Sequence, residues 1–132
     1  MFTSDTDLRR FGRGYLLAAA AVLLFGTVYE AFSFGVISPF MLGACLLPFL
    51  LGCVPVCLWL QGLLPAPSLW VRRLQLGAVC TLTAGCILRG ALDIYGTTNR
   101  LLLVYPAAGI LLFLGAAVLQ ARAAVRQRSA RR

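Results

Sequence analysis

The chain has 132 residues, of which 61% are hydrophobic and 12% are charged, and its mean hydropathy is +0.89. A soluble domain of this size cannot hide so much apolar side chain behind so few charges, so the composition predicts an integral membrane protein. The basic residues are all arginines, and the absence of histidine excludes histidine-ligated haem and catalysis through a Ser-His or Cys-His pair. We expect no enzyme, and we assign no catalytic, cofactor-binding or metal-binding residues.

Four stretches are apolar enough to cross a bilayer, which takes about 20 residues at a rise of about 1.5 Å each. Pro48 and Pro55 are expected to bend or loosen the second stretch, which neighbouring helices make tolerable. The connectors are too short for a separate domain, so residues 1–132 are predicted to form one all-α, four-helix membrane bundle. The predicted spans are residues 15–34, 40–64, 74–94 and 101–120.

Arginine placement predicts the orientation of these spans. Three arginines precede the first span, two lie in the second connector and five fall in the tail, residues 121–132. All of these lie on one side, while Arg100 lies on the other, so the positive-inside rule places both termini in the cytoplasm. The tail is expected to extend the fourth helix and to attract anionic lipid headgroups, by about 1 kcal/mol per arginine. A cleavable signal peptide is the competing interpretation of the first span, and the acidic Glu30 argues against it.

The two outer turns are similar in outline. Each has an acid, an aromatic residue two positions later, a glycine and a turn rich in hydroxyl groups. Two tandem helical hairpins would produce this pattern, because both hairpins run in the same direction. Turns between spans also collect such residues without any duplication, so both explanations stand.

Three segments of these turns resemble a group of uncharacterised small four-helix bacterial membrane proteins. They are residues 29–36 (YEAFSFGV), 38–41 (SPFM) and 94–99 (IYGTTN). The resemblance covers the two outer turns and the general hydropathy. It implies a multi-pass protein of the bacterial plasma (inner) membrane, and it implies no activity.

A polar cluster is predicted near the outer leaflet. Glu30 and Arg89 each lie 15 residues along their spans, roughly 22 Å from the inner boundary, so they share a depth and are able to pair. Asp93 is one helical turn beyond Arg89, and Tyr105 lies about one turn into the fourth span. Charges in a span cost about 2.5–3.5 kcal/mol, which makes them functional candidates. The cluster is interpreted either as an ion-pair network that fixes helix register or as a vestibule for an ion or polar solute, with Glu30 as its titratable group.

The cysteines and the small residues concern packing. Cys53 and Cys57 share a helix face, a spacing compatible with a soft metal, but two thiols make a poor site and free cysteine packs as a small apolar residue. A stripe of small residues, Gly77, Thr81 and Gly85, is typical of close helix contacts in lipid. We expect this stripe to bring the third helix against the first, and so Arg89 toward Glu30.

Two functions remain open. The first is a non-enzymatic accessory or interaction subunit, which binds other helices within a homo-oligomer or a larger membrane complex. The alternative is a small homodimeric transporter or channel for an ion or polar solute that uses the outer Glu/Arg/Asp cluster. Nucleic acid is not expected as a partner, because the basic tail lacks interleaved aromatic residues.

Overall fold

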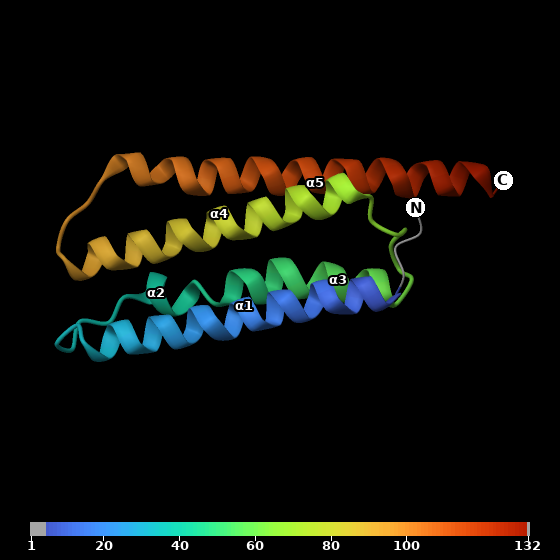
Figure 1. The fold of residues 1–132 in the computed structure, drawn as a ribbon. Coiled ribbons are helices and arrows are strands. Elements are labelled where there is room, and N and C mark those ends of the chain that lie inside the picture. Colours follow the sequence, from blue (N-terminus) through green and yellow to red (C-terminus); the bar gives the residue numbers. More distant parts are fainter. Residues whose placement is uncertain (1–4, 132) are drawn as a thin grey trace.

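The computed structural model describes residues 5–131, which fold into a bundle of four long helical segments (Figure 1). All four are long and apolar enough to cross a membrane, which confirms the predicted all-α, four-helix architecture. The second segment, Pro39–Leu60, is not a single regular helix. The elements are α1 (Asp5–Ala31), α2 (Pro39–Gly43), the π-helix η1 (Pro48–Cys53), α3 (Val54–Leu60), α4 (Leu69–Ile94), the 3₁₀-helix η2 (Arg100–Leu103) and α5 (Val104–Ala130).

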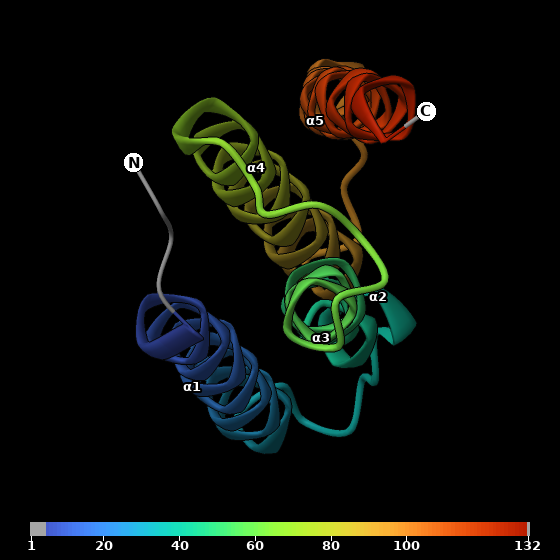
Figure 2. The same cartoon turned by 90° about the vertical axis from the view of Figure 1, so that its right-hand side faces the viewer.

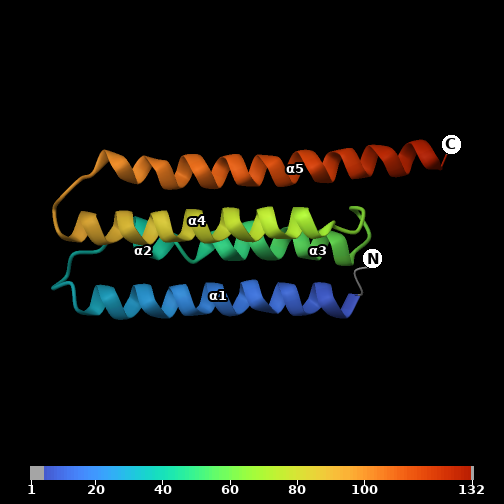
Figure 3. The same ribbon diagram turned by 45° about the horizontal axis from the view of Figure 1, so that its top comes forward.

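The helices extend beyond the predicted spans at the end of the bundle where the chain starts and finishes. α1 begins at Asp5 and α5 continues to Ala130. Hydropathy marks only the apolar part of a helix, and arginine is a good helix former that lets the helix continue past it. Figure 3 shows the basic end of α5 running past the other helices, as expected for the tail, whose residue 132 lies outside the described part of the chain.

The packing order differs from the predicted one. The second span packs on α1 and on α4, and α5 packs on α4, so α1 and α5 lie at opposite corners of the end-on view (Figure 2). The small-residue stripe does not bring α4 against α1. Instead Gly85 lies under Tyr105 of α5, and Gly109 of α5 receives Leu82 of α4. The predicted contact between the first and third helices is therefore wrong at this stripe, because the stripe packs against the fourth helix.

Two prolines disrupt the second span, as the sequence predicts. Pro48 opens the π-helix η1, and Pro55 has no N–H to bond the carbonyl of Leu51 in the preceding turn. Gln75 of α4, which is 2% exposed, donates from Nε2 to this carbonyl at 2.9 Å and to that of Gly52 at 3.4 Å. A side chain of α4 thus satisfies backbone that the second span cannot satisfy by itself.

The apolar core lies toward the end of the bundle that carries the termini. Phe11 packs edge-on against the Tyr15 ring at 4.9 Å, and the guanidinium of Arg72 lies 4.6 Å from the Phe11 ring centre. At the other end Met41 of α2 is wedged between Gly26 of α1 and Gly90 of α4. The core side chains are Leu8, Tyr15, Val56, Trp59, Val71, Val79 and Ala116.

Candidate functional site

The structure brings two residues of the predicted cluster together. Arg89 Nε lies 3.5 Å from Asp93 Oδ1, one turn along α4, and the two side chains are 40% and 29% exposed. The Arg89 guanidinium also lies over the ring of Phe40 in α2, 5.6 Å from its centre. The pair is therefore partly open to its surroundings and anchored to the second span by an aromatic ring.

Glu30 does not join this pair. Within residues 5–131, no ion pair connects it to Arg89, and its Oε1 is buried without a hydrogen-bond partner. The equal depth of Glu30 and Arg89 in their spans is not sufficient for pairing, because the second span packs between α1 and α4. Ser38, which precedes α2, also has a buried hydroxyl that makes no hydrogen bond to the described residues.

Tyr105, the fourth predicted member, has a packing role in the structure. Its Cβ covers Gly85 on α4, one turn before Arg89. In the described part of the chain its hydroxyl forms no hydrogen bond with the cluster. Sequence reasoning missed a different aromatic contact, in which the side chains of Tyr29 and Tyr95 meet at the ends of α1 and α4. Each tyrosine lies within two residues of the acid at the outer end of its span, and this was the available signal.

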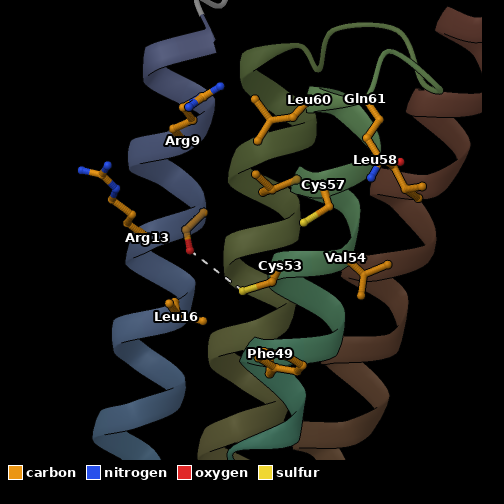
Figure 4. A pocket seen from close by; sticks show the side chains of 12 residues that line it. Arg9, Arg13, Leu16, Phe49, Cys53, Val54, Cys57, Leu58, Leu60 and Gln61 are labelled. Carbon is orange, nitrogen blue, oxygen red and sulfur yellow. Dashed lines mark hydrogen bonds between the residues drawn. The ribbon is translucent and has the colours of Figure 1, made fainter.

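Two of the grooves between helices are further candidate sites. The α1/α3 groove, of about 540 Å³, lies between α1 and the second span and is shown in Figure 4. Its walls are apolar, and the charged residues that line it are Arg9 and Arg13. The thiols of Cys53 and Cys57 also line it, and Cys53 Sγ lies 3.9 Å from the Gly12 carbonyl oxygen.

The second, the α3/α5 groove, has a volume of about 290 Å³ and lies where α5 stands apart from α3 (Figure 2). Gln120 of α5 donates from Nε2 to the carbonyl of Pro65 at 2.7 Å. Its Oε1 and the Trp59 Nε1 are buried and make no hydrogen bond within residues 5–131. The remaining lining residues are mostly apolar: Pro55, Leu58, Leu64, Val71, Gln75, Phe113, Ala116, Ala117, Ala121 and Ala124.

These places offer apolar packing surfaces and hydrogen-bonding groups. Within residues 5–131, no three His, Cys, Asp or Glu side chains gather where they could hold a metal ion. All five cysteines are free thiols. Comparison of the chain with known protein families, with curated proteins and with solved structures found no match in any of the three.

Proposed function

We propose that this protein is a non-enzymatic accessory subunit that binds a transmembrane helix of a partner protein in the α3/α5 groove. The observation that carries the proposal is the pairing of apolar walls with two buried polar atoms, Trp59 Nε1 and Gln120 Oε1, that lack partners among the described residues. Leaving such an atom without a hydrogen bond costs about 1–3 kcal/mol. Both atoms belong to residues that line the groove, so a partner helix with an acceptor and a donor removes that cost once the two side chains turn toward it.

The physics of the bilayer favours a helix as the occupant. In lipid, helices associate through close packing of small residues and through interhelical hydrogen bonds. Ala117, Ala121 and Ala124 give the α5 wall a smooth surface, and Trp59 and Gln120 supply the polar groups. We place both termini in the cytoplasm, because α1 and α5 carry their arginines at the same end of the bundle (Figure 1). The bacterial plasma membrane is what the resemblance of the two outer turns implies.

Photocrosslinking in native membranes tests the proposal. A photoreactive residue at Ala117, which lines the groove, should give one protein adduct, whereas the same residue at Leu111, which is 70% exposed and lies outside the groove, should not. Replacement Ala121→Trp should fill the groove and abolish the adduct. Equal crosslinking at both positions, or an adduct that survives Ala121→Trp, would contradict helix binding. An adduct of two copies of this chain would replace the accessory role with homo-oligomer formation.

The second candidate is a small homodimeric transporter or channel for an ion or polar solute. The buried Oε1 of Glu30, without a partner within residues 5–131, favours it, because such a carboxylate is available to a bound cation. Reconstitution in liposomes distinguishes the two candidates. Flux that stops in Glu30→Gln and persists in Asp93→Asn would support transport, and the absence of flux from the unchanged protein would contradict it.

A further inference from the structure

The α1/α3 groove separates its polar and apolar groups along its length. Arg9 and Arg13 lie on α1 at its rim, with the guanidinium of Arg13 turned away from α3, and Gln61, which follows α3, belongs to the opposite wall (Figure 4). Toward the middle of the bundle, Leu16 of α1 faces a wall that includes Phe49 and Val54. The groove therefore has apolar walls and carries polar side chains at the rim of one end, which is the pattern of an amphiphile.

Helix geometry places these groups at suitable depths. From Arg9 to Leu16 the helical rise is roughly 10 Å, and from Gln61 to Phe49 it is roughly 18 Å. If the arginines are at the level of the headgroups, Leu16 and Phe49 are at the level of the hydrocarbon. The polar end is also the end of the bundle at which α1 begins and α5 ends (Figure 1).

The charge of the rim selects the headgroup. Arg9 and Arg13 are exposed and one turn apart on the same face of α1, and no carboxylate pairs with either of them in the described chain. Guanidinium groups bind phosphate through charge-assisted and often bidentate hydrogen bonds. The Gln61 amide adds a neutral donor on the other wall. A lipid with a net negative charge is attracted by the two arginines. A zwitterionic lipid is attracted less, because its own cationic group is repelled by them.

We propose that the α1/α3 groove binds one anionic phospholipid from the leaflet at the termini. Its phosphate lies at the rim, beside the arginines of α1, and part of one acyl chain lies along Leu16 and Phe49. This site goes beyond the helix-binding role, which concerns the α3/α5 groove. It also differs from the general attraction of the basic tail for the membrane, which has no groove to hold a chain.

Native mass spectrometry in mild detergent tests the site with phosphatidylglycerol and phosphatidylcholine as probes. The unchanged protein should retain one phosphatidylglycerol in preference to phosphatidylcholine. Combining Arg9→Gln with Arg13→Gln should lower the affinity for phosphatidylglycerol by about 30-fold. The matched control combines Arg126→Gln with Arg128→Gln, which removes the same charge from the end of α5 and should leave the single retained lipid in place.

A variant that fills the groove and the labelling of a cysteine that lines it test the site without changing the arginines. Val54→Trp fills the groove and should release the lipid, whereas Leu17→Trp, at a position 71% exposed and outside the groove, should not. Phosphatidylglycerol should also slow maleimide labelling of the exposed Cys57 in this groove, but not that of the exposed Cys80 elsewhere. Equal retention of the two lipids, or equal losses in the two double-arginine variants, would overturn the proposal.

Discussion

In the first hairpin, α1 packs on a span that is broken by prolines and contains a π-helix, whereas in the second hairpin α4 and α5 pack as two long helices. The first hairpin fits the ring of Tyr15 against Gly52, and the second fits Leu82 against Gly109. Both use a glycine to bring two helices together. They differ in whether the backbone beside that glycine receives hydrogen bonds from side chains of the other hairpin.

The broken span depends on the other hairpin. Gln75 of α4 satisfies the carbonyls of Leu51 and Gly52, and Gln120 of α5 satisfies that of Pro65 just beyond α3. The Leu51 and Gly52 carbonyls lie inside the second span, where a bilayer offers no water to replace the Gln75 donor. The first hairpin is therefore the dependent one, and the two outer turns can be alike without the halves being interchangeable. Gly35 and Gly96 both adopt positive φ in those turns, which leaves the tandem-hairpin hypothesis open.

The largest effect is expected at the two packing glycines. An added Cβ at Gly52 meets Cβ, Cγ and the ring of Tyr15, which are close to the α1 backbone, so Gly52→Ala should lower the free energy of unfolding by about 3 kcal/mol. At Gly109 the obstacle is Cγ and one methyl group of Leu82, and an aliphatic side chain can change rotamer more easily than a ring, so Gly109→Ala should cost about 1 kcal/mol.

Reversible unfolding in mixed detergent micelles measures both changes. Gly14→Ala is the matched control, because nothing lies within 4 Å of the position of its added Cβ, and it should be neutral or stabilising by about 0.5–1 kcal/mol. Equal costs at Gly52 and Gly109 would remove this difference between the hairpins.

The next effect concerns the donors. Gln75→Leu should destabilise the protein by about 2 kcal/mol, because it leaves the Leu51 carbonyl without a donor. Gln120→Leu should cost about 1 kcal/mol or less, because it loses one bond but also removes a buried oxygen that lacks a partner among the described residues. Pro55→Ala restores the missing N–H, so the cost of Gln75→Leu should fall in that background. An unchanged cost in the double variant would show that Gln75 acts through packing alone.

Much of the fold was predictable because the determining signals are local. Span number follows from length and hydropathy, and the break in the second span follows from its prolines. The sequence does not show which helices pack against each other, because the stripe around Gly77 and Gly85 marks a close-packing face without indicating which helix covers it. Gln75 was missed, although a proline that frees a carbonyl in one span calls for a donor from another.

The candidate site could also be predicted only in part. The proximity of Arg89 and Asp93 is a property of one helix and could be predicted from their spacing. The pairing of Glu30 with Arg89 required the rotation of two helices about their axes and the position of a third, and rise per residue gives depth only. The grooves depend on where helices diverge, which no single segment of the sequence encodes.

A small effect is expected at the ion pair of the second hairpin. Arg89→Leu should change the free energy of unfolding by about 1 kcal/mol or less, because the pair is long and both side chains are partly exposed. Its cost should decrease as the salt concentration is raised, since salt screens exposed charges. Unfolding at low and high salt measures this, with Arg100→Leu as a control on an exposed arginine outside the pair. A large cost that does not depend on salt would instead indicate a buried network.

The smallest effect is expected for the coupling energy between Glu30 of the first hairpin and Arg89 of the second. If Glu30 and Arg89 do not interact, the effects of Glu30→Gln and Arg89→Leu on the free energy of unfolding should add, with a coupling energy below about 0.5 kcal/mol. Coupling between Arg89→Leu and Asp93→Asn, measured in the same way, should exceed it, because those two side chains are in contact. The reverse ranking would mean that the acid of the first hairpin reaches the arginine of the second, and that α2 does not separate them.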